Sequence, residues 1–403
     1  MRSIKRHPLA GLSRSVGFSR RAGTLAAGLI AVAGLAACAA GPAIESDSAT
    51  PGTATAPKLP DGTGVNTGTR YSADADMQAV LGQLATLGGK PIEMLTPAQA
   101  RLQPSPADAV KALLIKQSRS TEPTDLVPGV TSRDRTIPGA AGSLPVRIYT
   151  PEGPGPFPVV VYFHGGGWVI ADKGTYDDGA RGIAKEANAV VMSVDYRRAP
   201  EARFPAAWND SLAAYRWAAN NARVLNAKPR VLALAGESAG GNLALATAIA
   251  VRDARLPKPA AVLAVYPVAQ TGDMSTASYV DSASAKPLNK PMIDWFVDQL
   301  LANPTQKSDK RLDLVHAQLA GLPPVTIINA QIDPLREDGA LLANALTAAG
   351  VPVERKVYAG TTHEFFGMAA VVNDARDAQA FAGERLRSAF EQAPATPGVK
   401  RRR

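Results

Sequence analysis

The hexapeptide GESAGG at Gly236–Gly241 constrains this chain most, because it directly follows an apolar run at residues 230–235. The apolar run predicts a β-strand and the residues from Ala239 onward predict a helix, so Ser238 falls on a sharp turn between them. Such a turn strains the backbone, and the flanking glycines let strand and helix pass closely. This geometry would push the hydroxyl of Ser238 out of the sheet. A GxSxG pattern also arises by chance in a glycine-rich chain, so the surrounding residues decide its meaning.

Strand and helix patterns alternate along most of the chain. Their order predicts an α/β fold with a mostly parallel, doubly wound sheet. Residues 269–319 interrupt the order with Pro, Ser and charged residues, which predicts an insertion over the carboxyl edge of the sheet, where such folds bind ligands. The predicted strands are 144–150, 158–163, 189–196, 231–235, 260–266, 325–330 and 353–358, and the predicted helices are 206–223, 239–252, 292–301, 337–349 and 374–391.

The first 37 residues combine a basic leader with an apolar segment at 22–37 that is short for a membrane-spanning helix. They predict an export signal that is not part of the fold. The segment ends in Leu-Ala-Ala-Cys38, which resembles the lipobox of bacterial lipoproteins. Cys38 is therefore the predicted lipidation site and would anchor the exported chain to a bacterial membrane, on the periplasmic or surface side. The alternative is an ordinary signal peptide that ends in a cysteine.

Beyond this signal, composition divides the chain into three parts. Residues 38–72 are rich in Gly, Pro, Ala, Thr and Ser and predict a flexible tether. Residues 73–392 predict the globular domain, which begins with two amphipathic helices, and residues 393–403 form a basic tail. Basic residues at the two ends account for the formal net charge of +9, which leaves no basic face for nucleic acid. Cys38 is the only cysteine, so an internal disulfide is excluded.

A serine hydroxyl needs a positioned base before it becomes a good nucleophile, and the chain has four histidines. His7 lies in the signal, His316 lies in the insertion, and His164 sits in a glycine run where it is expected to order the loop. His363 follows the last strand in GTTHEFF, a position from which a loop can fold back over the sheet edge. His363 is therefore the predicted base.

The base in turn needs an acid to hold its tautomer. Asp333 directly follows the strand at 325–330, and Pro334 ends that strand, which leaves a carboxylate at the carboxyl edge. Glu337 and Asp338 compete for this role, but they lie in the first turn of the next helix, where acidic residues are ordinary dipole partners. The chain order Ser238, Asp333, His363 is that of α/β-hydrolases.

A tetrahedral intermediate also needs hydrogen-bond donors for its oxyanion. Gly165, Gly166 and Gly167 end an earlier strand and have no Cβ atom to keep a substrate oxygen away from their amides. The amide of Ala239, at the start of the helix, can add another donor. These four residues are the predicted oxyanion hole, although a simple glycine turn is the structural alternative.

These motifs resemble the hormone-sensitive-lipase-like, or HGGG, esterases. The resemblance runs from about residue 76 to 391 and implies the α/β-hydrolase fold, with a helical cap at about 73–118 and 269–319 over the site. It also implies the triad and oxyanion roles given above. The commonest form of the family has Leu where this chain has Arg198, and the lipobox and tether are unusual additions. The motifs that carry the resemblance are HGGGW, DYRRAPE, GESAGG, YPV, DPLRED and HEFF.

We therefore expect an exported serine carboxylesterase that hydrolyses short-to-medium acyl esters through an acyl-enzyme. Its partners would be a small-molecule ester substrate and a membrane, and it would need no metal or cofactor. A lipase, amidase or deacetylase acting on envelope lipids or polymers would share the same residues. A surface binding protein on a hydrolase scaffold is the non-enzyme alternative, and it predicts a degraded triad.

Overall fold

The computed structural model describes residues 70–393. The predicted signal, Cys38, nearly all of the predicted tether and the basic tail from residue 394 lie outside the described residues. Within the described range, no helix is long and apolar enough to cross a membrane.

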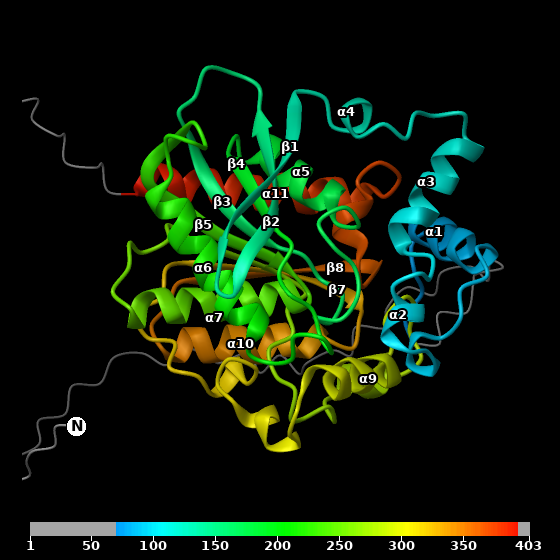
Figure 1. The fold of residues 1–403 in the computed structure, drawn as a ribbon. Coiled ribbons are helices and arrows are strands. Elements are labelled where there is room, and N and C mark those ends of the chain that lie inside the picture. Colours follow the sequence, from blue (N-terminus) through cyan, green and yellow to red (C-terminus); the bar gives the residue numbers. More distant parts are fainter. Residues whose placement is uncertain (1–69, 394–403) are drawn as a thin grey trace, which may run out of the picture. The chain divides into compact units, whose positions relative to one another are not determined.

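One sheet of eight strands organises the described part of the chain (Figure 1). The bounds of the strands are β1 Val130–Gly139, β2 Gly142–Pro151, β3 Phe157–Phe163, β4 Val190–Val194, β5 Ala227–Glu237, β6 Val262–Val265, β7 Val325–Ile332 and β8 Val353–Thr362. Their order across the sheet is β1-β2-β4-β3-β5-β6-β7-β8. The pairs β1/β2 and β2/β4 are antiparallel and all other neighbours are parallel, so the prediction of a mostly parallel α/β sheet is confirmed.

Helices precede, connect and cover these strands. The α-helices are α1 Ala75–Thr86, α2 Pro97–Ala100, α3 Pro106–Lys116, α4 Pro123–Leu126, α5 Asp177–Glu186, α6 Ala206–Asn220, α7 Ala239–Asp253, α8 Ala277–Asp281, α9 Lys290–Leu300, α10 Arg336–Ala348 and α11 Asn373–Gln392. Short 3-10 helices are η1 Ile92–Met94, η2 Pro304–Ser308, η3 Leu314–His316 and η4 Phe365–Met368.

The sheet is covered on both faces. Along β3, Val159, Val161 and Phe163 pack with residues of α6, α7 and α10, while Val160 and Tyr162 pack with residues of α1, α3, α5 and α11 on the other face. The alternation follows from the two-residue period of a strand. Because both faces are buried, the central strands contain nearly continuous apolar runs, such as residues 157–163 of β3, which is why sequence could identify them.

Besides several short helices, the sequence prediction missed one long strand and one long helix. Residues 130–139 form β1, whose side chains are mostly exposed because it lies at the sheet edge, so no apolar period marks it. Residues 177–186 form α5, which begins with two aspartates and contains two glycines. Because glycine and aspartate are poor helix formers, this segment has little intrinsic tendency to be helical. Its burial against α11 and the sheet stabilises it instead.

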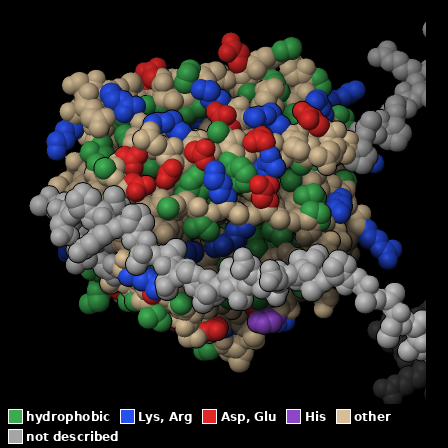
Figure 2. Space-filling view, turned by 180° about the vertical axis from the view of Figure 1, so that it is seen from behind, with side chains coloured by type: hydrophobic (Ala, Val, Ile, Leu, Met, Phe, Trp, Pro, Cys, Tyr) green, Lys and Arg blue, Asp and Glu red, His purple; other side chains and the backbone are tan. Residues whose placement is uncertain are grey.

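The segment before the sheet and the insertion after β6 both contain helices at the predicted places. Ser105 and Asp108 form a reciprocal capping box at the start of α3. Asn289 caps α9 by accepting a hydrogen bond from the amide of Met292, 2.8 Å away. On the face of the molecule seen in Figure 2, basic and acidic side chains are interspersed rather than gathered by sign.

Candidate active site

Ser238 occupies the turn between β5 and α7 with φ 57° and ψ −119°, a conformation that residues other than glycine rarely adopt. The crossing of strand and helix explains the glycines around it. A Cβ atom on Gly236 would lie 2.2 Å from the carbonyl oxygen of Gly240, and one on Gly240 would lie 2.0 Å from that of Phe163. The predicted strand-turn-helix geometry is confirmed, and the hydroxyl of Ser238 borders a pocket.

The structure brings Ser238, Asp333 and His363 together. Nε2 of His363 lies 3.0 Å from Oγ of Ser238, and Nδ1 lies 2.8 Å from Oδ2 of Asp333. All three residues are buried, with 6 %, 0 % and 2 % of their surface exposed for Ser238, Asp333 and His363. With its proton on Nδ1, the imidazole donates to Asp333 and accepts from the serine hydroxyl. This arrangement can take up the serine proton as the oxygen attacks a carbonyl.

The electrostatics of His363 favour its charged form. Burial alone would lower the pKa of the imidazole, but the charge of Asp333 and its hydrogen bond raise it, and the net shift is upward. The carboxylate is fixed from its other side, because Oδ1 of Asp333 accepts a hydrogen bond from the amide of Leu335 at 2.9 Å. The ring of Tyr266 lies against the imidazole with a centroid distance of 4.5 Å. The Asp333 carboxylate can therefore stabilise His363 in its protonated, imidazolium form.

Glu337 and Asp338, the alternatives to Asp333, accept hydrogen bonds from backbone amides of the insertion. Oε2 of Glu337 accepts from the amide of Ser278 at 3.0 Å, and Oδ2 of Asp338 accepts from the amides of Ala269 and Gln270 at 2.9 and 3.3 Å. Both lie in the first turn of α10, as predicted. Burial raises the pKa of Asp338 to about 8.

The glycine run after β3 fits its surroundings closely. A Cβ atom on Gly166 would lie 2.3 Å from the carbonyl oxygen of Ile170, and one on Gly167 would lie 2.2 Å from the ring of Phe296. Gly166 and Gly167 also have positive φ values and line the same pocket as Ser238. Gly165 packs against the hydroxyl of Tyr176, which would lie 2.2 Å from an added Cβ atom. Each glycine is thus required by a different neighbour.

Ala239 is the first residue of α7, so its amide belongs to the N-terminal turn, where helices have donors without an intrahelical acceptor. Ala239 is fully buried beside Ser238. With Gly166 and Gly167, it places candidate donors around the serine.

The remaining described histidines do not contact Ser238. His164 is buried and stacked on Tyr196 at 4.3 Å, and its Nδ1 lies 2.9 Å from the carbonyl oxygen of Gly165. It orders the glycine loop, as the sequence predicted. His316 lies at the surface with its Nδ1 2.8 Å from Asp313.

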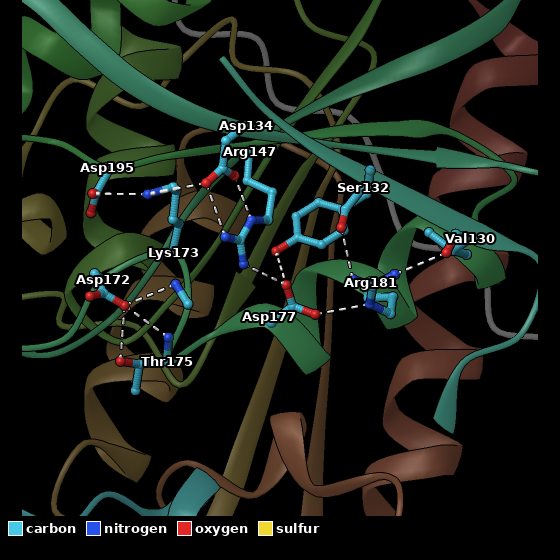
Figure 3. Close-up of polar contacts among 12 residues, drawn as sticks. Val130, Ser132, Asp134, Arg147, Asp172, Lys173, Thr175, Asp177, Arg181 and Asp195 are labelled. Atoms are coloured by element: carbon cyan, nitrogen blue, oxygen red, sulfur yellow. Dashed lines mark hydrogen bonds and ion pairs between the residues drawn. The ribbon is translucent and has the colours of Figure 1, made fainter. Parts of the chain in front are cut away.

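A charged network joins β1, β2 and α5 (Figure 3). Arg147 of β2 binds Asp134 of β1 at 2.7 Å and Asp177 of α5 at 3.0 Å. Asp177 also accepts from Arg181 at 2.9 Å and from Tyr149 at 2.7 Å. Sequence did not indicate this network, because its members lie on three elements of which two were missed. It fixes α5, and thereby Tyr176, beside the glycine run.

The pocket beside Ser238 has a volume of about 450 Å3. Its wall combines the segment before the sheet with the insertion, and most of its surface is apolar. η1 and α9 contact each other, and residues of both line the pocket. The apolar residues that line it include Leu81, Leu84, Ile92, Ile170, Leu288, Met292 and Phe296.

Arg101 is a pocket residue that sequence did not indicate. Its guanidinium binds both carboxylate oxygens of Glu201, at 2.9 and 2.7 Å, and donates to the carbonyl oxygens of Val169 and Ala199 at 2.9 and 2.8 Å. It fastens the segment before the sheet to two loops, the one that follows the glycine run and the one that follows β4. Arg198, the departure from the common family form, donates to the carbonyl oxygen of Ala171 in the same loop.

Among residues 70–393, no group of three or more His, Cys, Asp or Glu side chains is arranged to hold a metal ion.

Comparison with known proteins places the chain among esterases. The alpha/beta hydrolase fold family matches residues 160–367. The chain is 39% identical to carboxylesterase NlhH of Mycobacterium tuberculosis over 279 residues, which are 68% of this chain and 87% of that protein. It is 33% identical to an ethyl acetate hydrolase of Pseudomonas putida, over 58% of this chain and 74% of that protein.

Solved structures give the same result. A thermostable esterase from Pseudomonas putida superposes with a TM-score of 0.70 at 31% identity, covering 79% of this chain and 98% of that one. An esterase from the archaeon Pyrobaculum calidifontis gives a TM-score of 0.70 at 31% identity over the same shares of the two chains.

Proposed function

The chain belongs to the alpha/beta hydrolase fold family and is a carboxylic ester hydrolase, and on that premise we propose that it is a serine esterase of the hormone-sensitive-lipase-like group. The observation that carries the proposal is the hydrogen-bonded line from Ser238 through His363 to Asp333, which borders the apolar pocket. A triad of this kind supports acyl transfer through a covalent intermediate.

In the proposed mechanism, Oγ of Ser238 attacks the ester carbonyl carbon while Nε2 of His363 takes the hydroxyl proton. Asp333 holds the imidazole and stabilises the imidazolium. The tetrahedral intermediate collapses, and His363 returns the proton to the leaving alcohol. Water then attacks the acyl-enzyme by the same route and releases the acid.

The oxyanion would be bound by backbone amides of Gly165, Gly166, Gly167 and Ala239. Gly166 and Gly167 have the stronger support because they line the pocket with Ser238, whereas Gly165 packs on Tyr176. Loss of a single oxyanion donor typically costs about 10²–10³ in rate.

The proposed substrates are esters with short-to-medium acyl chains. A volume of about 450 Å3 supports this range, since small-molecule sites span about 300–1,000 Å3. We propose that the two segments at about 73–118 and 269–319 act as the cap, because residues from both line the pocket.

We also propose that the chain is exported and anchored to a membrane through lipid on Cys38. The support is the basic leader, the apolar run and the Leu-Ala-Ala-Cys38 sequence. Palmitate labelling and membrane fractionation of the wild type and Cys38→Ser test this, and retention of both label and membrane association by Cys38→Ser would refute it.

The esterase proposal is tested with a panel of p-nitrophenyl esters from acetate to palmitate, together with an anilide series. Ser238→Ala should abolish hydrolysis, and the wild type should prefer short-to-medium acyl chains over palmitate. A preference for palmitate or for anilides would instead favour the lipase or amidase alternative. Unchanged ester hydrolysis in Ser238→Ala would refute the assignment of the nucleophile.

A further inference from the structure

The residue after the base, Glu364, adopts a left-handed backbone conformation with φ 72° and ψ 0°. Glycine adopts this conformation freely, whereas a residue with a Cβ atom does so at a cost in free energy. Glu364 nevertheless occupies the position, immediately beside His363. A strained residue at this place requires compensation from contacts of its side chain.

The side chain of Glu364 makes such a contact with Tyr176. The tyrosine hydroxyl donates to Oε1 of Glu364 at 2.5 Å, although 188 positions separate the two residues in sequence. Tyr176 is 5 % exposed and immediately precedes α5. Both residues line the pocket that contains Ser238.

The same hydroxyl also packs on the glycine run. An added Cβ atom on Gly165 would lie 2.2 Å from Oη of Tyr176, so the hydroxyl rests on the backbone of Gly165. The hydroxyl of Tyr176 therefore contacts both the residue after the base and the segment that carries the candidate oxyanion donors.

The sheet connects these two segments only indirectly. Gly165 follows β3 and His363 follows β8, and β5, β6 and β7 lie between those strands. No strand pairing joins β3 to β8 directly, so side-chain contacts between the loops that follow them add to the constraint that the sheet supplies. Sub-ångström placement of reacting groups matters, because a misplacement of about 1 Å can cost about 10²-fold in rate.

We propose that Glu364 is a positioning residue that, through Tyr176, holds the base loop and the Gly165–Gly167 segment at the correct separation for catalysis. This inference rests on the proposed esterase function. It assigns no direct contact with substrate to Glu364.

An electrostatic role is the alternative. The charge of Glu364 contributes to raising the pKa of His363, after burial and the larger contributions of Asp333. Glu364→Gln distinguishes the two roles, because the amide oxygen can accept the same hydrogen bond without a charge. Glu364→Gly removes the bond and also relaxes the backbone.

The test measures kcat, KM and the melting temperature of Glu364→Gly, Glu364→Gln and Tyr176→Phe with p-nitrophenyl butyrate. In Glu364→Gly, the lost bond and the relieved strain oppose each other, so the melting temperature should stay within about 3 °C. Its kcat should fall about 10–100-fold, with a smaller change in KM. Glu364→Gln should restore kcat at least about tenfold relative to Glu364→Gly.

Tyr176→Phe removes the bond without changing residue 364, so it tests the inference even if a substitution there impairs folding. Its loss in kcat should resemble that of Glu364→Gly. The double variant that combines Glu364→Gly with Tyr176→Phe should lose no more kcat than either single variant, because both substitutions remove the same bond. The matched control is Arg255→Gly, which relaxes another left-handed residue, with φ 52°, at an exposed position outside the pocket. It should leave kcat unchanged.

A kcat within twofold of the wild type in Glu364→Gly would overturn the inference. So would a Glu364→Gln variant as slow as Glu364→Gly, because charge and not the bond would then act, and so would additive losses in the double variant. These failures are distinct from failure of the proposed function. If Ser238→Ala is inactive while Glu364→Gly is fully active, only the positioning role is wrong.

Discussion

Asp333 and His363 form an almost fully buried pair, with Nδ1 of the histidine 2.8 Å from the carboxylate and side-chain exposures of 0 % and 3 %. A second pair in this chain, Asp313 and His316, has the same separation of 2.8 Å but lies at the surface. The two pairs provide a natural comparison, because they differ in burial and in surroundings.

Asp333→Asn should reduce kcat about 10³–10⁴-fold. An asparagine cannot hold the imidazole in the tautomer that accepts the serine proton. The measurement is the steady-state hydrolysis of p-nitrophenyl butyrate. Asp313→Asn changes the surface pair in the same way and should leave kcat within twofold. Equal effects at the two positions would contradict the assignment of the acid.

The pH dependence of kcat/KM should follow the neutral form of His363, because only this form accepts a proton. Burial opposes protonation, but the charge and hydrogen bond of Asp333 raise the pKa of His363 above its ordinary value of 6.5. Activity should therefore fall as pH drops, with a midpoint above 6.5. Profiles between about pH 5 and 9 test this, and a midpoint clearly below 6.5 would exclude it.

Gly240→Ala should destabilise the protein severely. The new Cβ atom would lie 2.0 Å from the carbonyl oxygen of Phe163, which is backbone and cannot move aside without displacing β3. We expect a loss of about 3 kcal/mol or more, measured by urea unfolding. Gly272→Ala is the control, since its added Cβ atom meets nothing within 4 Å. A stable, active Gly240→Ala would show that the crossing of strand and helix can widen.

Arg101→Lys should loosen the segment before the sheet. A lysine cannot make the two parallel bonds to Glu201 or reach both backbone carbonyls at once. We expect kcat/KM to fall about tenfold, mainly through KM, because Arg101 lines the pocket. Arg119→Lys is the control, because exposed Arg119 donates to the carbonyl oxygen of Ala370 instead. An unchanged KM in Arg101→Lys would contradict this role.

Glu237→Gln should change the pH dependence of stability. Burial raises the pKa of Glu237 from 4.5 to about 7, so the folded state favours the protonated carboxyl. The stability that this group contributes is present below about pH 4.5 and is lost as pH rises through about 7. A glutamine does not ionise and does not lose this contribution. The free energy of unfolding of the variant, relative to that of the wild type, should therefore rise by up to about 3 kcal/mol as the pH is raised from about 5 to 8.5. The control is Glu384→Gln, at an exposed position, whose stability relative to the wild type should not change with pH. Melting curves of both variants and the wild type at about pH 5 and 8.5 test the prediction.

The central strands and most helices could be predicted because local patterns carry them. The strands buried on both faces contain nearly continuous apolar runs, such as residues 157–163 and 231–235, and the helices that cover them show a period near 3.6. Edge strand β1 and helix α5 lack these patterns. Arg147, Asp177 and Arg181 stabilise them, and such contacts between distant segments leave no periodic mark in the sequence.

The sequence by itself determined the α/β order and the chemical types of the candidate site, because a turn such as that at Ser238 requires glycines at 236 and 240. It placed Ser238, Asp333 and His363 after three parallel strands, which are β5, β7 and β8 in the structure and whose carboxyl ends meet at one edge of the sheet. Only the tertiary structure decided the distances between them and the roles of Arg101, Tyr176 and Glu364. Those side chains act across loops that no strand pairing connects, so their partners are fixed by packing in three dimensions and not by spacing along the chain.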